Sequence, residues 1–177
     1  MKDDSSKIVR LLKKGSADGF RLVAETFGPR IFALTLQITG SRSEAEELTS
    51  DVLMKVFRNI DTFREDRGTL SAWILTIAHH SAVSAVRRLR PERITAELEE
   101  NIPVSTEDAS ETDEVALVGE AIDSLPAPDR ALIHLRYYEN YSLKDISEIT
   151  GIAAATLAVR LKRLREKIKR YILSNHE

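Results

Sequence analysis

A strongly acidic segment near the middle of the chain divides it into two units. Residues 91–114 carry nine acidic residues against one basic residue, with two prolines and no aromatic residue. Such a segment buries too little apolar surface to offset the entropy of ordering its backbone. We therefore expect a linker at residues 91–114 between an N-terminal unit, residues 1–90, and a C-terminal unit, residues 115–177.

The charge balance supports this division, although the net charge of the 177 residues is only −2. The N-terminal unit has 15 basic and 11 acidic residues, and the C-terminal unit has ten and eight. The absence of cysteine excludes a disulfide scaffold, a thiolate zinc site and a cysteine nucleophile. No apolar run approaches the roughly 20 residues that span a bilayer, and the first residues lack the pattern of a signal peptide. We expect a cytoplasmic protein without membrane insertion.

Apolar residues recur at helical spacing in both units, and no segment alternates in the manner of a strand. The sequence therefore predicts two small all-α domains joined by a flexible acidic linker. In the N-terminal unit, the first pattern runs from Phe20 to a stop at Gly40. Because Gly28 and Pro29 interrupt it, this stretch is either one helix or two in tandem.

Two further helices are expected in the N-terminal unit. Ser43 followed by Glu46 has the spacing of a capping box, and the apolar residues after it recur at helical spacing as far as Ile60. A third helix is expected over residues 69–90, because Pro91 disfavours its continuation. These three patterns are enough to form a small helical bundle.

The C-terminal unit has the pattern of a helix-turn-helix. Asp129 is expected to cap an early helix of this unit. Ser142 and Asp145 have capping spacing at the start of a short helix, and Gly151 can adopt the positive φ that ends one helix and turns sharply into the next. A second helix is expected from Ala153 onward. Two short helices joined by a glycine turn are typical of DNA-binding motifs.

The second helix of this motif is strongly basic. Residues 160–170 contain seven cations, opposed only by Glu166. Arginines bind phosphates or guanine edges with paired hydrogen bonds, and small residues at a helix start allow close approach to the major groove. A solvated face, a membrane-surface helix and a partner-binding helix are the alternatives. Membrane association is disfavoured because the apolar stripe is narrow and lacks tryptophan and phenylalanine.

Longer motifs carry a family resemblance. Residues 45–63, extended by 73–78 and Arg87-Arg88, resemble region 2 of bacterial RNA polymerase sigma factors, and residues 125–163 resemble region 4. The compact extracytoplasmic-function (ECF) group has only these two regions. The resemblance implies a non-enzymatic subunit without cofactors that binds core RNA polymerase and directs it to promoters. It also implies an anti-sigma factor as a further partner.

The resemblance assigns roles to particular residues. The residues implied to bind the β′ clamp helices of core polymerase are Glu47, Asp51, Lys55, Arg58 and Asn59. Melting of the minus-ten element is assigned to the turn at residues 64–68 and the helix that follows it. The residues implied to bind promoter DNA are His80, Arg87, Arg88, Ala154, Ala155, Thr156, Arg160, Lys162 and Arg163. Trp73 could stack on a base, but its helical register makes core packing the favoured interpretation.

Several positions depart from the family pattern. His79 and His80 lie where arginine and asparagine are common, and Ser84-Ala85 replaces an acidic-aromatic pair. Residues 155–159 retain only the threonine of the family motif. We therefore expect minus-thirty-five recognition that is weak, unusual or dominated by DNA shape.

Two other functions explain less of the sequence than the sigma-factor hypothesis does. A helix-turn-helix regulator acting without core polymerase would need only the C-terminal motif, and residues 44–63 would have no purpose in it. A small hydrolase would need an oriented nucleophile and base, and Ser81 near His79 and His80 lacks any orienting partner in the sequence. The two histidines point to different helix faces and have no cysteine nearby, so a metal site is not expected there.

Overall fold

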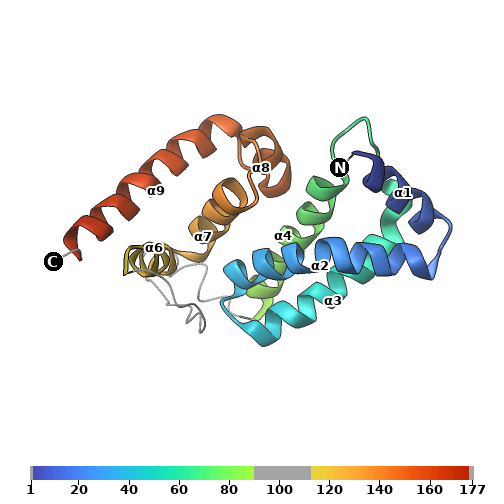
Figure 1. The fold of residues 1–177 in the computed structure, drawn as a ribbon, viewed down its shortest axis with the longest axis horizontal. Helices are drawn as coiled ribbons and strands as arrows, with labels where there is room; N and C mark the ends of the chain where they lie inside the picture. The colour runs from blue at the N-terminus through green and yellow to red at the C-terminus, as the bar shows by residue number, and fades with distance from the viewer. Residues whose placement is uncertain (1, 90–112, 176–177) are drawn as a thin grey trace.

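The computed structural model describes residues 2–89 and 113–175, and every regular element within those ranges is helical. Figure 1 shows two groups of helices, with the N-terminus in one group and the C-terminus at the far end of the other. The elements of the N-terminal unit are α1 (Lys2–Lys13), α2 (Ala17–Thr39), α3 (Arg42–Asn59), a 3₁₀ turn η1 (Ile60–Thr62) and α4 (Leu70–Leu89). The elements of the C-terminal unit are α6 (Asp113–Asp123), α7 (Ala127–Ile133), a π-helical turn η2 (His134–Tyr138), α8 (Leu143–Thr150) and α9 (Ala154–Ser174). The all-α prediction is confirmed.

The long helix α2 is the centre of the N-terminal unit, where it packs on α1, α3 and α4. It is one continuous helix through Pro29, which settles the choice between one helix and two. Proline in a helix interior costs about 3 kcal/mol, and burial of Phe27 and Ile31 on either side offsets that cost. The helix ends as expected at Gly40, whose φ of 67° is left-handed.

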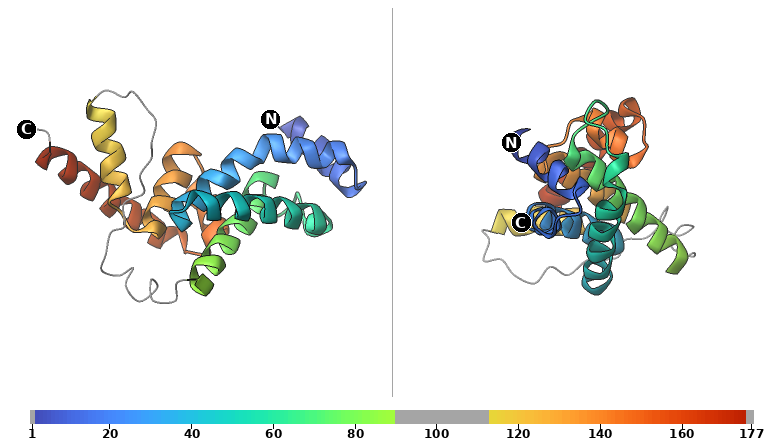
Figure 2. Two further views of the ribbon diagram at one scale, coloured as in Figure 1. Left: turned by 90° about the horizontal axis from the view of Figure 1, so that it is seen from below. Right: turned by 90° about the vertical axis from the view of Figure 1, so that its right-hand side faces the viewer.

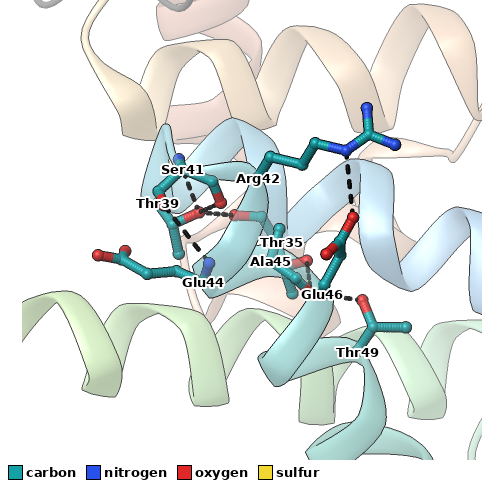
Figure 3. A network of polar contacts seen from close by, with 8 residues as sticks. All are labelled: Thr35, Thr39, Ser41, Arg42, Glu44, Ala45, Glu46 and Thr49. Carbon is teal, nitrogen blue, oxygen red and sulfur yellow. Dashed lines mark hydrogen bonds and ion pairs between the residues drawn. The ribbon is translucent and has the colours of Figure 1, made fainter.

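The turn from α2 to α3 is fixed by threonine and serine hydroxyls (Figure 3). The Thr39 hydroxyl donates to the carbonyl of Thr35 at 2.9 Å, and its oxygen accepts from the backbone N–H of Ser41 at 3.3 Å. Thr39 is 1% exposed, and these hydrogen bonds help to satisfy its buried hydroxyl. The turn therefore holds α2 and α3 in a defined antiparallel arrangement.

The predicted capping box at Ser43 and Glu46 is wrong. The N-cap of α3 is Ser41, whose Oγ accepts from the backbone N–H of Glu44 at 3.4 Å. Glu46 instead pairs with Arg42, with 3.1 Å between Oε1 and Nε. Because Gly40 ends α2 so abruptly, the next residue already has the extended backbone of an N-cap.

Helix α1 lies outside the motifs found in the sequence, and it packs closely against the start of α2. Its residues Ile8, Val9 and Leu12 are buried. At Gly19 of α2, an added Cβ would lie 2.8 Å from the backbone of Leu11 and Leu12. The glycine is therefore required by the close approach of two helix backbones.

This contact gives the first prediction. Gly19→Ala is expected to lower the free energy of unfolding by about 1–3 kcal/mol, because backbone atoms must move to accept the methyl group. Gly28→Ala is the matched control: it lies in the interior of the same helix with nothing within 4 Å of the added Cβ, so it should stabilise by roughly 0.5–1 kcal/mol. Urea unfolding of both variants checks the prediction. Equal stabilities would contradict the close approach of α1 and α2.

The two units share one continuous apolar core. Helix α8 packs on α4, and α7 packs on α2, while α6 lies beside α9 at the far side of the C-terminal unit (Figure 2). Buried residues that belong to this core include Leu34, Ile74 and Leu75 from the N-terminal unit and Leu132, Leu135 and Ile146 from the C-terminal unit. Helix α6 begins at Asp113, before the expected boundary at residue 115. The rest of the expected linker, and Arg90, lie outside the described residues.

Candidate nucleic-acid and polymerase interfaces

The helix-turn-helix is formed by α8 and α9. Ser142 and Asp145 make the predicted capping box, in which Ser142 Oγ accepts from the Asp145 N–H at 3.1 Å and Asp145 Oδ2 accepts from the Ser142 N–H at 3.1 Å. Gly151 ends α8 with a φ of 75°, as predicted. Buried Ile149 and Leu157 lie on either side of this turn, and α9 starts at Ala154, one residue later than expected.

The outer face of α9 is available for DNA. Ala154, Ala155 and Thr156 form the exposed first turn, and Lys162 and Arg163 are exposed further along the helix. Neither cation has an ion pair within the part of the chain that the structure describes, so both positive charges face solvent. This arrangement places small side chains at the helix start and cations about two turns further along, which suits a helix entering a major groove.

Arg160 has a partner inside the molecule. Its Nε lies 2.6 Å from Asp129 Oδ1 of α7. The prediction that Asp129 caps α7 is wrong: Pro126 is the N-cap, and Asp129 is in the first turn. Because Pro126 is the N-cap, the helix begins earlier in the chain than a cap at Asp129 would allow. The ion pair fixes α9 against α7, so Arg160 has a structural role whether or not it also meets DNA.

The five residues assigned to polymerase binding all lie on exposed positions of α3. Glu47, Asp51 and Lys55 are spaced by four residues, which places them on one side of the helix. Lys55 also donates from Nζ to Ser81 Oγ of α4 at 2.9 Å, and Asn59 Nδ2 donates to the Lys55 carbonyl at 2.8 Å. Arg58 has no ion pair within the described residues. The result is an exposed helix face that carries both signs of charge.

On α4, three of the residues assigned to DNA binding are exposed: His80, Arg87 and Arg88. Both arginines lie in the last turn of the helix. Trp73 is partly buried and packs on Phe63, with 5.5 Å between ring centroids. The prediction of core packing for Trp73 is confirmed.

Comparison with known proteins decides the family. The model described as Sigma-70 region 2 matches residues 23–92, and that described as Sigma-70, region 4 matches residues 116–168. The ECF RNA polymerase sigma factor SigW of Bacillus subtilis (strain 168) is 27% identical over 94% of this chain and 95% of its own length. SigK of Mycobacterium ulcerans (strain Agy99), another ECF sigma factor, is 24% identical over 90% of this chain and 89% of its own. The chain belongs to the ECF RNA polymerase sigma factors.

Solved structures have the same fold as this sigma factor. The sigma factor RpoE in complex with the anti-sigma factor NepR from Bartonella quintana matches with a TM-score of 0.71 at 24% identity, over 88% of this chain and 98% of that one. CnrH in complex with the cytosolic domain of CnrY matches with a TM-score of 0.69 at 16% identity, over 97% and 98%. At these identities the structures support the fold alone. The hypothesis of a regulator acting without polymerase is not favoured, because region 2 is present as well as region 4.

His79 lies between the two units of this sigma factor rather than on the open face of α4. It lines a pocket of about 180 Å³ between α2, α4 and α7. Burial, with a smaller contribution from His80, lowers the pKa of His79 to about 4. Its buried Nδ1 has no hydrogen-bond partner in the described part of the chain. A neutral imidazole is therefore favoured in the folded protein.

The arrangement around the two histidines offers no support for hydrolysis. Ser81 is 9% exposed and accepts a hydrogen bond from Lys55, so its hydroxyl faces α3. The rings of His79 and His80 contact each other with centroids 5.7 Å apart. Within residues 2–89 and 113–175, no group of three or more metal-ligating side chains is placed together, and no helix has the length and hydropathy of a bilayer-spanning segment.

A pH prediction follows from His79. In the unfolded chain the pKa of the His79 imidazole is near 6.5. Below that pH the unfolded chain therefore takes up a proton that the folded chain does not. The contribution of His79 to the free energy of unfolding is therefore fully present above pH 6.5 and is lost as the pH falls toward 4. The loss amounts to about 1 kcal/mol between pH 7.5 and 5.5. His79→Gln should reduce this loss in urea unfolding, whereas His80→Gln, at an exposed position, should retain it. Burial also lowers the pKa of His134, so part of the dependence should remain; an unreduced loss in His79→Gln would refute the assignment.

Some residues that hold the units together gave no sequence signal. Arg30 of α2, Ser71 of α4, and Glu139 and Tyr141 of the segment between η2 and α8 meet only in the folded chain. The π-helical turn η2 was also not expected. It ends at Tyr138 with Glu139 as its C-cap, and the following residue, Asn140, has a φ of 57°. No periodicity rule marks such a turn.

Proposed function

We propose that this ECF sigma factor binds core RNA polymerase through its N-terminal unit and directs initiation at promoters that both units contact. One observation carries the proposal: region 2 and region 4 follow each other on one chain, and each unit has an exposed charged face. The N-terminal unit, residues 1–90, takes the minus-ten element, and the C-terminal unit, residues 115–177, takes the minus-thirty-five element. The chemistry of RNA synthesis belongs to polymerase, so the sigma factor requires no catalytic group or cofactor.

The polymerase-binding surface is the exposed side of α3. The residues we assign to it are Glu47, Asp51, Lys55, Arg58 and Asn59. A face with both signs of charge favours one orientation on a partner with the complementary pattern and disfavours others. By resemblance to the family, that partner is the pair of β′ clamp helices.

The minus-thirty-five surface is the start of α9. Ala154 and Ala155 can offer methyl contacts to thymine, and the Thr156 hydroxyl can form a hydrogen bond with a base or a phosphate. Lys162 and Arg163 lie two turns further on and are placed to bind phosphates. Arg160 keeps its role as a proposed DNA contact, with the Asp129 ion pair limiting its freedom.

The minus-ten surface consists of the turn at residues 64–68 and α4. Extracting bases from a duplex costs a few kcal/mol for each unstacked base, which contacts to the separated strand must offset. Arg87 and Arg88 provide cations for phosphates, and His80 provides a ring and hydrogen-bonding nitrogens. All three side chains are exposed on α4.

An inhibitory protein is a further partner that we propose. RpoE of Bartonella quintana was solved with the anti-sigma factor NepR, and CnrH with the cytosolic domain of CnrY. An anti-sigma factor of this sigma factor would mask the same surfaces of α3, α4 and α9. Because chromosomal promoters lie in the cytoplasm, the proposed function also implies a cytoplasmic protein.

Co-elution of the full-length chain with core RNA polymerase in size-exclusion chromatography tests the polymerase-binding part of this function. The proposal expects a stable complex at micromolar concentrations. Failure to co-elute, with a folded chain by circular dichroism, would remove its basis.

A further inference from the structure

An exposed valine lies in the middle of the proposed minus-thirty-five surface. Val159 is 53% exposed, and it is the only large apolar side chain of α9 before Leu173 that is exposed to solvent in this way. It is two residues from each of the buried Leu157 and Leu161, which places it about 160° around the helix axis from both. Val159 therefore lies on the side of α9 that faces away from the core.

The nearest neighbours of Val159 on that side are small or positively charged. Ala155 and Thr156 lie one turn before it, and Lys162 and Arg163 lie one turn after it. All four are exposed. Side chains at these spacings are adjacent on a helix surface. The side of α9 that is open to DNA therefore has an apolar centre, with cations toward its C-terminal end.

A valine at an exposed helix position has a cost, because its branched side chain lowers helix propensity relative to alanine and its methyl groups remain in water. Single exposed apolar residues are common on protein surfaces, so exposure by itself defines no role. The place of Val159 in the motif is more informative. It is the sixth residue of α9, within the N-terminal part of a recognition helix that reaches base edges in the major groove.

The major groove offers an isopropyl group one matching partner. The C5 methyl of thymine is the apolar group on its base edges, whereas guanine, adenine and cytosine present hydrogen-bonding atoms there. An isopropyl group over those atoms removes water without replacing its hydrogen bonds. Against a thymine methyl, the same group buries apolar surface on both partners. The contact therefore favours thymine over the other three bases.

We propose that Val159 selects a thymine in the minus-thirty-five element through contact with the C5 methyl group of that base. This inference rests on the proposed role of α9 in binding the element. Contacts from Lys162 and Arg163 to phosphates position the helix but carry no sequence information. Loss of the Val159 side chain should therefore alter base preference and leave the salt dependence of binding unchanged.

Removal of a single methyl group from the DNA tests this proposal. Holoenzyme assembled from core polymerase and the full chain first selects fragments from a pool of random duplexes. Each thymine of the selected minus-thirty-five element is then replaced in turn by deoxyuridine, which lacks only the C5 methyl group. One of these replacements should lower the affinity of the holoenzyme about fourfold, as expected for one buried carbon group. With Val159→Ala the same replacement should have no effect, and selection should no longer require thymine at that position.

Val115→Ala is the matched control. It removes the same atoms from a valine of α6 that is 46% exposed, and it should retain the effect of deoxyuridine. Val159→Ala should itself remain folded, because the position is exposed and alanine favours a helix. Urea unfolding of both variants checks this.

An effect of deoxyuridine that disappears in Val159→Ala and remains in Val115→Ala would support the proposal. An equal effect in Val159→Ala and the unaltered chain would overturn it, and so would a selected element without thymine. Weaker binding of Val159→Ala to core polymerase, with an unchanged base preference, would also overturn it and would identify Val159 as a protein contact. Failure of the proposed function is distinguishable, because the unaltered chain would then form no holoenzyme or select no element, and both proposals would fall together.

Discussion

Replacement of both Lys162 and Arg163 by alanine is expected to weaken binding to promoter duplex DNA by at least about tenfold, since hydrogen bonds to charged groups contribute roughly 1.5–3 kcal/mol each. Both side chains are exposed on α9. If each neutralises one phosphate, the slope of log affinity against log salt concentration should also become shallower by about 1.8. Fluorescence anisotropy at several salt concentrations measures both quantities.

The control for this prediction is Lys13→Ala with Lys14→Ala, which removes two exposed cations from the N-terminal unit. It changes the net charge by the same amount but lies away from α9. An equal loss in the control would show that total charge, and not the α9 surface, determines binding. An unchanged slope in the α9 variant would reject the contact role of both residues. Arg160 is less suited to this test, because its replacement also breaks the ion pair with Asp129.

Replacement of Asp51 and Arg58 by alanine is expected to weaken binding to core RNA polymerase by at least about tenfold, because truncating one partner of a charge pair that the complex buries costs about 2 kcal/mol or more. The pair is preferred to Asp51 with Lys55, since Lys55 also bonds to Ser81 within the fold. Fluorescence-detected titration of the labelled sigma factor with core polymerase measures the change.

Asp18→Ala with Arg21→Ala is the matched control for that titration. It removes the same two residue types from an exposed ion pair on α2, with 3.1 Å between Arg21 Nη2 and Asp18 Oδ1. The control should bind polymerase as the unaltered chain does, and both variants should unfold at similar urea concentrations. Equal affinity of the α3 variant and the unaltered chain would contradict the assignment of α3.

Local patterns were sufficient to predict α2, α3, α4 and the helix-turn-helix, but not α1 or η2. Gly40 and Gly151 end helices because they adopt positive φ, which is a property of single residues and can be recognised in the sequence. The capping box at Ser142 was predicted for the same reason. Ser43 was mistaken for a cap because two serines compete near the start of α3, and only the backbone left by Gly40 decides in favour of Ser41.

Contacts between residues far apart in the sequence could not be predicted. Asp129 has the spacing of a cap, but it pairs with an arginine 31 residues away. Arg30 and Glu139 are separated by more than half of the chain, and neither belongs to a recognisable motif. Long-range pairs of this kind depend on how helices pack, which periodicity does not encode. The exposure of the proposed polymerase and DNA residues is observed, whereas their binding roles remain predictions.

The most direct test of the account is run-off transcription with purified core polymerase, this sigma factor and DNA fragments from upstream of genes induced by its expression. The account predicts transcripts of defined length that require both the sigma factor and a particular upstream sequence, and that decline in the variant lacking Lys162 and Arg163. Transcription by core polymerase that is the same with and without the sigma factor, on every fragment, would contradict it.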